Sequence, residues 1–143
     1  MIIPEKKYRE LLEYLPILCV DIIIPMEEGY LLLKRNNEPK KGRWWVPGGR
    51  IHKGETALAA AVRKVREETG LKISEIKPLG YYEAIFKKSS FGLVKRGYHV
   101  LSIVFLCRAD SQNIYLDQQS SKWKIGKLPK DFKIKKFFQG EPI

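Results

Sequence analysis

The sequence predicts one α/β domain over residues 1–143, an α/β/α sandwich on a mixed β-sheet. The chain has 143 residues, of which 44% are hydrophobic, as expected of one ordinary globular domain. Helical and strand-like patterns follow one another in the order helix, strands, helix, strands, helix, without an internal repeat. Alternation of this kind typically places helices against both faces of one sheet.

The first third of the chain predicts a helix, a hairpin and a short strand. Residues 4–14 have one apolar side and precede Pro16, which is typical of an amphipathic helix. The apolar run 17–24 predicts a buried strand, with 30–34 as its hairpin partner across a polar turn. After a polar loop, residues 44–46 predict a short strand that stops at Pro47-Gly48-Gly49.

The one long helix is predicted over residues 56–69, and Gly70 is placed to end it in the left-handed conformation. Apolar or small residues at steps of four, three and four form a stripe that we expect to face the core. Charged residues are expected on the opposite side. The stripe consists of Leu58, Val62, Val65 and Thr69, and the charged residues are Arg63, Lys64, Glu67 and Glu68.

The second half of the chain predicts two long strands and two short closing elements. Residues 81–86 and 98–108 are strand-like and expected to pair with each other. A short strand near 123–125 and a short basic helix around 130–138 complete the expected domain.

The net charge of +11, from 27 basic and 16 acidic residues, favours an anionic partner: a nucleotide, a nucleic acid or an acidic membrane. Residues 87–99 carry +4 and residues 122–136 carry +6, and the rest is nearly neutral. A nucleic-acid binder more often concentrates its charge on one helix or sheet face. We therefore expect a field that draws in a small anionic substrate, with nucleic acid as the alternative partner.

Cysteine usage and hydropathy predict a cytoplasmic protein. Cys19 and Cys107 lie in apolar runs and are expected to be free buried thiols, although a disulfide between neighbouring strands is the alternative. The first fourteen residues carry six charged side chains, unlike a signal peptide. The longest apolar run, 15–26, is too short to span a bilayer and contains Asp21, so we expect no membrane association.

A glycine loop, a helix start and adjacent carboxylates lie within 25 residues. Pro47-Gly48-Gly49 precedes the long helix, which carries Glu67 and Glu68. Hard oxygen ligands beside a glycine loop favour a Mg²⁺ site. The alternative is a solvated charged helix face.

This pattern resembles the sequence box of the Nudix hydrolases, which implies a Nudix-like fold and hydrolysis of a nucleoside diphosphate compound. Eight positions match in register: Gly49, Glu55, Arg63, Val65, Glu67, Glu68, Gly70 and Leu71. One departs, because Lys64 replaces the first glutamate of the helix. Lys64 can share a helix face with Glu67 and Glu68. We therefore predict one metal ion, or a weaker second one.

A closer resemblance, over roughly residues 10–75, is to the GDP-mannose mannosyl hydrolases. It is carried by residues 15–17, 20–21, 33–39, 42–51 and 53–55. The subfamily also lacks the first glutamate of the box, and an arginine follows its double glycine, as Arg50 does here. The resemblance implies attack by water at the anomeric carbon of the sugar, a Mg²⁺ cofactor that Mn²⁺ can replace, and a homodimer as an open alternative.

The two resemblances imply a role for each residue of this chain that occupies a matching position. Arg35 and Arg50 would hold the diphosphate, since guanidinium forks suit phosphate oxygens, and Asp21 would accept from the sugar or base. Arg63 would support the loop around Glu55. The metal ligands would be the Gly49 carbonyl, Glu67, Glu68 and Gln119, and the catalytic residues Glu67 and Glu68.

The sequence leaves open which residue acts as the general base. The subfamily has a histidine after its late glutamine ligand, whereas Ser120 follows Gln119 here, and a serine cannot act as a base near neutral pH. His52, expected to face solvent, His99 and Glu83 are the alternatives to the carboxylates of the box.

The residues and the resemblances therefore leave three candidate functions. The leading one is a Mg²⁺-dependent hydrolase of a GDP-mannose-like nucleoside diphosphate sugar. The second, favoured by the retained Glu67 and Glu68, cleaves at phosphorus in ADP-ribose or a nucleoside triphosphate. The third, favoured by Lys64 and Ser120, is a catalytically impaired module that binds a nucleotide or RNA.

Overall fold

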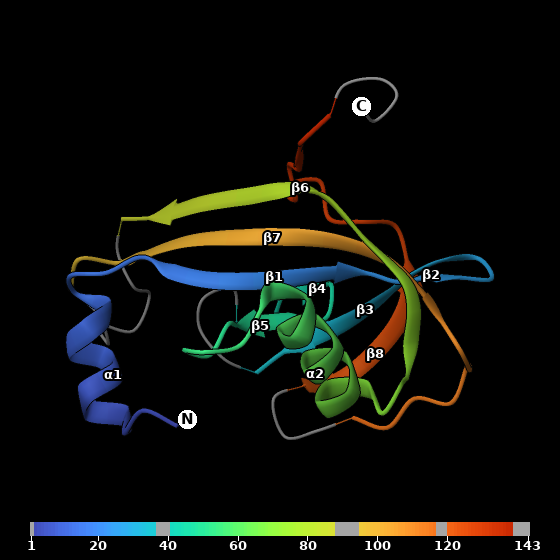
Figure 1. Cartoon of the computed structure of the whole chain (residues 1–143), viewed down its shortest axis with the longest axis horizontal. Helices are drawn as coiled ribbons and strands as arrows, with labels where there is room; N and C mark the ends of the chain where they lie inside the picture. The colour runs from blue at the N-terminus through green and yellow to red at the C-terminus, as the bar shows by residue number, and fades with distance from the viewer. Residues whose placement is uncertain (1, 37–40, 88–94, 117–119, 139–143) are drawn as a thin grey trace.

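The computed structural model describes residues 2–36, 41–87, 95–116 and 120–138, with the side chains of Ser120 and Ser121 left out. Within these ranges the chain forms two helices and nine strands (Figure 1). In chain order these are α1 (Glu5–Leu12), β1 (Ile17–Ile23), β2 (Pro25–Met26), β3 (Gly29–Arg35), β4 (Trp44–Trp45), β5 (Gly48–Arg50), α2 (Ala57–Thr69), β6 (Ile73–Phe86), β7 (Tyr98–Ala109), β8 (Ser120–Gly126) and β9 (Lys135–Lys136).

The strands form two sheets. The larger sheet has the order β5-β1-β7-β6-β9, and it is mixed because β1 runs parallel to β7 while its other pairs are antiparallel. The smaller sheet contains β2, β3 and β4, with β8 also paired to β3. Helix α2 packs against β1 and β5, whereas α1 lies at the end of the sheet where β1 begins (Figure 1). The predicted α/β fold with a mixed sheet is thus confirmed.

Two hydrophobic cores share the strands β1 and β3. Ile22 and Leu33 belong to the core that contains α2, whereas their neighbours Ile23 and Leu32 belong to a second core around Trp45. Successive side chains of a strand point to opposite faces, so each of these strands supplies both cores. This explains why the sequence shows continuous apolar runs there in place of an alternating pattern.

The caps of α2 agree with the sequence, but its predicted buried stripe is confirmed only for Val65 and Thr69. The Thr56 hydroxyl accepts from the Ala59 N–H at 3.1 Å, and Gly70 ends the helix with φ +73°. Leu58 and Val62 are 48% and 37% exposed. The face that packs inward instead consists of Ala60, Ala61, Lys64, Val65, Glu68 and Thr69. Alanines allow close approach to the sheet, and two charged side chains face the glycine loop, which periodicity alone did not reveal.

The expected hairpin and closing helix are also wrong in part. Residues 29–35 pair with β2, β4 and β8, while β1 pairs with β5 and β7 in the other sheet. Among the described residues no helix occupies 130–138, where β9 pairs with β6 instead. The chain passes so close there that a Cβ on Gly80 would lie 2.1 Å from the Lys135 carbonyl oxygen. The expected pairing of 81–86 with 98–108 is confirmed, and β6 extends back to Ile73.

Candidate active site

The glycine loop is held between β1 and α2. Strand β5 pairs antiparallel with β1, placing Gly48 opposite Asp21 and Gly49 opposite Val20. A Cβ on Gly48 would lie 2.3 Å from the Val20 carbonyl oxygen, and one on Gly49 would lie 2.6 Å from Lys64 Cε. Larger residues would therefore push the loop away from the strand and the helix.

Arg63 fixes the segment between the glycine loop and α2, as predicted. Its guanidinium donates to both carboxylate oxygens of Glu55, at 3.0 Å from Nε and 2.5 Å from Nη2, and to the Arg50 carbonyl at 3.0 Å. The His52 N–H also donates to Glu55, at 2.8 Å. These hydrogen bonds, those from Arg63 above all, lower the pKa of Glu55 to about 2. Glu55 and Arg63 are thus positioning residues of this loop.

The carboxylates of α2 meet the glycine loop and a lysine. Glu68 is 5% exposed, and its Oε1 accepts from the Gly48 N–H at 2.9 Å. The Lys64 ammonium lies 3.8 Å from Glu68 Oε1 and 3.8 Å from Glu67 Oε2. Lys64 therefore shares a face with both carboxylates, as the sequence predicted, although that face is turned toward the loop and Lys64 is only 4% exposed.

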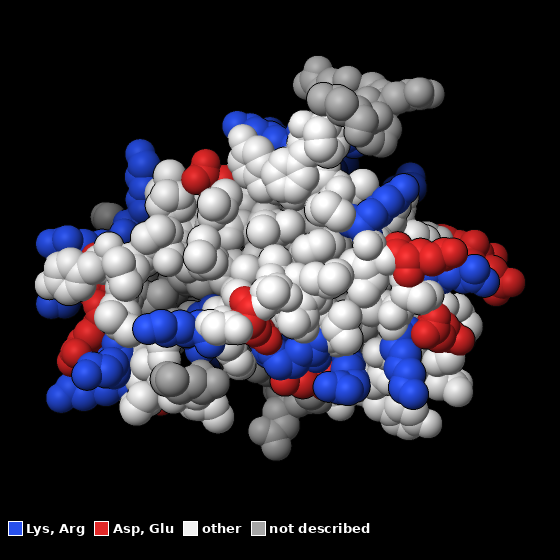
Figure 2. All heavy atoms as spheres, viewed as in Figure 1, with Lys and Arg blue, Asp and Glu red and all other residues white. Residues whose placement is uncertain are grey.

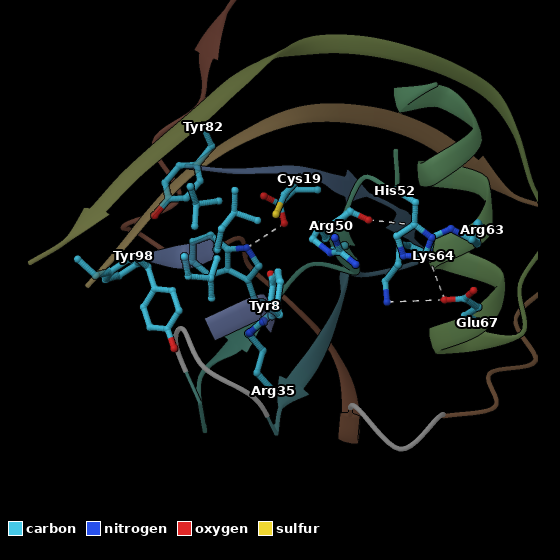
Figure 3. A pocket seen from close by; sticks show the side chains of 18 of the residues that line it. Tyr8, Cys19, Arg35, Arg50, His52, Arg63, Lys64, Glu67, Tyr82 and Tyr98 are labelled. Carbon is cyan, nitrogen blue, oxygen red and sulfur yellow. Dashed lines mark hydrogen bonds and ion pairs between the residues drawn. The ribbon is translucent and has the colours of Figure 1, made fainter. Parts of the chain in front are cut away.

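A cavity of about 710 Å³ opens beside this loop, and its two sides differ in chemistry (Figure 3). On one side, which we call the box side, Lys64 and Glu67 of α2 lie near His52. On the other, the aromatic side, Tyr82 and Tyr98 project from β6 and β7. Between them, the Arg50 guanidinium lies over the Tyr8 ring, 4.9 Å from its centroid, and Arg35 projects from β3.

Most of the predicted site residues meet at this cavity. Glu68 is not among the residues that line it, but it lies directly behind them through its contacts with Gly48 and Lys64. Gln119 lies outside the described residues, while the backbone of Ser120 pairs with Arg35. The predicted residues that line the cavity are Asp21, Arg35, Gly49, Arg50 and Glu67.

Asp21 is a buried acid, 8% exposed, in the middle of β1. The Trp45 indole N–H donates to its Oδ1 at 3.2 Å. The sequence predicted that a buried Asp21 would need such a partner, since burying a carboxylate without one is costly. Trp45 thus anchors Asp21 at the cavity wall.

His52 is the one histidine that lines the cavity. It is half-buried, and it faces the cavity. Burial, and then the nearby Arg63 guanidinium, lower the pKa of His52 below its usual range, which favours the neutral imidazole. His99 and Glu83 contact each other at 3.0 Å between Nε2 and Oε2, and neither lines the cavity.

Several cavity residues escaped the sequence analysis because no motif marks them. Tyr8 comes from α1, and Cys19 comes from β1 opposite Arg50.

Both cysteines are free, and burial raises the pKa of each thiol to about 12, so neither is a nucleophile at neutral pH. Burial likewise raises the pKa of Tyr82 to about 12, so its ring stays neutral at the aromatic side. The register of β1 against β5 brings Cys19 beside Arg50, whereas Tyr8 reaches the cavity from α1.

The predicted metal ligands of the described residues meet around the glycine loop, where Glu67 accepts from Arg63 at 3.2 Å and Glu68 accepts from the Gly48 N–H at 2.9 Å. Glu67, Glu68 and the Gly49 carbonyl offer the hard oxygen ligands that Mg²⁺ prefers. The described part of the chain contains no group of three or more His, Cys, Asp or Glu side chains that could hold a metal. Lys64 stands between the two carboxylates, where it opposes a further cation.

The basic segments of the sequence contribute Tyr98 to this cavity. Among the described residues, no lysine or arginine of 87–99 or 122–136 lines it. Figure 2 shows positive side chains at several separate places on one face, with acidic ones among them. No helix among the described residues has the length and apolar character that a membrane crossing requires.

The profile of the family described as "NUDIX domain" matches residues 16–130, so this chain belongs to the Nudix family. The low-salt glycan biosynthesis protein Agl8 of Haloferax volcanii is 34% identical over 128 residues, which cover 89% of this chain and 81% of Agl8. The ADP-ribose pyrophosphatase of Methanocaldococcus jannaschii is 46% identical over 102 residues, 71% of this chain. This chain spans about half of that relative, 54% of its length.

Solved structures agree on the fold. The NUDIX domain of Shewanella oneidensis NrtR, solved in complex with ADP-ribose, superposes with a TM-score of 0.62 at 22% identity. The match covers 86% of this chain and 82% of that one. The likeness supports the Nudix fold described above.

Proposed function

We propose that this chain hydrolyses a nucleoside diphosphate linked to a sugar, with a GDP-mannose-like compound as the first candidate. The observation that carries the proposal is the cavity with a charged box side, an aromatic side and Arg35 and Arg50 between them. A substrate of this class combines an anionic diphosphate with a flat base and a polar sugar. The similarity to a glycan biosynthesis protein also favours a nucleotide sugar.

Each part of the substrate has a matching set of side chains. Arg35 and Arg50 would bind the diphosphate through charge-assisted hydrogen bonds and stabilise the charge that builds on it as it leaves. Asp21, held by Trp45, would accept from a sugar hydroxyl or a base N–H. Tyr82 and Tyr98 would contact the base through their rings.

The catalytic carboxylates are proposed to be Glu67 and Glu68, which together with the Gly49 carbonyl would hold Mg²⁺ or Mn²⁺. When bound, such an ion supplies positive charge to a phosphate oxygen and activates water. Nudix enzymes generally use divalent metals, and this donor set is of the kind they need. In the sugar-releasing reaction, His52, which lines the cavity, would take the proton that Ser120 cannot.

Attack at phosphorus is the second candidate. It is favoured by the retained pair Glu67 and Glu68 and by the 46% identity to a protein named ADP-ribose pyrophosphatase. The same cavity would then bind ADP-ribose, and the products would be two phosphate esters in place of a nucleoside diphosphate and a free sugar.

Isotope labelling distinguishes attack at carbon from attack at phosphorus. The protein is incubated with Mg²⁺ in ¹⁸O water together with GDP-mannose, ADP-ribose or nucleoside triphosphates, and the products are analysed by mass spectrometry. Label in the free hexose supports attack at carbon, and label in a phosphate supports attack at phosphorus. No turnover at high enzyme concentration would contradict both and favour a module that binds a nucleotide or RNA.

The cytoplasmic location and the homodimer stay predictions. Cell fractionation tests the first, and sedimentation of the purified chain tests the second.

A further inference from the structure

Lys64 is a charged side chain in an unusual setting. It is 4% exposed, and its stem packs against the glycine loop so closely that a Cβ on Gly49 would lie 2.6 Å from Cε and 3.2 Å from Nζ. A lysine is almost never this buried unless its ammonium is paired. The structure therefore holds a positive charge in a fixed place between the loop and α2.

The ammonium faces two carboxylates and the cavity at once. Glu67 Oε2 and Glu68 Oε1 each lie 3.8 Å from Nζ, beyond the 2.7–3.2 Å typical of a direct hydrogen bond. The attraction is thus mainly that between charges. Lys64 also lines the cavity, as do Arg35 and Arg50 (Figure 3). Because the ammonium is held at the cavity wall, its positive charge attracts an anionic ligand bound there.

We propose that the Lys64 ammonium binds the diphosphate of the substrate. It stands where an acidic residue of the Nudix box would help to bind a further metal ion, and it supplies part of that ion's positive charge itself. The inference rests on the proposed function for the class of substrate. It predicts that the cavity binds a nucleoside diphosphate without any metal.

A purely structural role for Lys64 makes a different prediction. If the ammonium only neutralises Glu67 and Glu68, its removal would lower stability and leave the affinity for a nucleotide unchanged. Lys64→Met separates the two roles because methionine keeps an unbranched apolar stem and removes the charge. Lys64→Gln, which keeps a polar end, replaces it if the methionine variant does not fold.

The first test is calorimetric titration of ADP into the protein in excess EDTA. We expect measurable binding to the unaltered chain and at least about tenfold weaker binding to Lys64→Met, the usual cost of losing a charged hydrogen bond. Lys72→Met is the matched control, because Lys72 is exposed and does not line the cavity. Its affinity should stay within about twofold. Equal affinity of Lys64→Met and the unaltered chain would overturn the proposal.

The second test counts metal ions by electron paramagnetic resonance of bound Mn²⁺. We expect one ion in the unaltered chain and a second in Lys64→Glu, together with weaker ADP binding in EDTA. Two ions in both chains would contradict the idea that Lys64 stands in for a metal. Neither measurement needs turnover, so the result is separate from the outcome of the labelling experiment on the proposed function.

Discussion

The box side and the aromatic side of the cavity are built in different ways. On the box side, residues 48–68 are close in sequence and are fixed by hydrogen bonds and ion pairs, such as Glu68 to the Gly48 N–H and Arg63 to Glu55. The aromatic side and the wall beside it draw residues from α1, β6 and β7, such as Tyr8 and Tyr82, which are 74 positions apart. The first side holds residues of the Nudix box, and we propose that the second determines substrate choice.

Helix α1 lines part of the cavity although it lies outside the residues that match the family. It ends at Leu12, before the family match begins at residue 16, yet Tyr8 and Leu12 line the cavity. None of its residues is fully buried, and its C-terminal end is tied to the rest of the chain by Glu13, which accepts from the Lys95 and Arg96 N–H groups. This wall of the cavity is thus formed partly by a segment outside the family match.

The largest effect is expected from Glu68→Gln on the box side. The amide can still accept from the Gly48 N–H, so the loop should hold, but the negative charge for the metal is lost. We expect turnover of whichever substrate is active to fall by about 100-fold or more. The measurement is the steady-state rate in Mg²⁺, with thermal unfolding as the control for folding. A loss below tenfold would place the essential carboxylate elsewhere.

Glu55→Gln should lower the stability of the folded chain, because the Glu55 carboxylate holds the box side through its hydrogen bonds. The Glu55 pKa of about 2 in the folded chain lies below the ordinary value of 4.5, so folding favours the ionised form. This stabilisation is present above pH 4.5 and is lost as the pH falls toward 2. After allowance for screening we expect Glu55→Gln to lower the free energy of unfolding by about 1–2 kcal/mol at pH 7. Urea unfolding of both chains should show the difference shrink from pH 4.5 downward; a constant difference would contradict it.

Tyr8→Ala tests the wall that α1 forms between the box side and the aromatic side. Its ring lies under the Arg50 guanidinium, so its loss should loosen a group proposed to bind the diphosphate and remove apolar surface from the cavity. We expect KM to rise about 3- to 10-fold with kcat nearly unchanged, since Tyr8 makes no contact with the carboxylates of α2. Lys7→Ala, an exposed neighbour on the same helix, is the control. A fall in kcat with unchanged KM would mean that Tyr8 acts on the chemical step, the role proposed for the box side, and not on binding.

The same contrast explains what could be predicted from sequence. Gly49, Glu67 and the Glu55–Arg63 pair are set by local spacing, because a loop and the helix after it bring residues 8 to 20 positions apart into contact. Tyr8 and Tyr98 come from α1 and β7, and both line the cavity although they are far apart in sequence, which no local pattern encodes. The buried face of α2 was predicted only in part because Ala60 and Ala61 belong to the core, whereas hydrophobicity alone favours Leu58.

The smallest effect is expected from the basic segment 122–136. Lys127 and Lys130 line a separate groove with Arg43 and Trp44, and neither touches the cavity, so they can act on the substrate only through the long-range field. Replacing both with Glu should lower kcat/KM by about twofold at low salt and leave it unchanged at high salt, where screening removes the field. The measurement is kcat/KM across a salt series. A tenfold loss that persists at high salt would mean that this segment contacts the substrate directly, and the substrate would then extend beyond the two sides of the cavity.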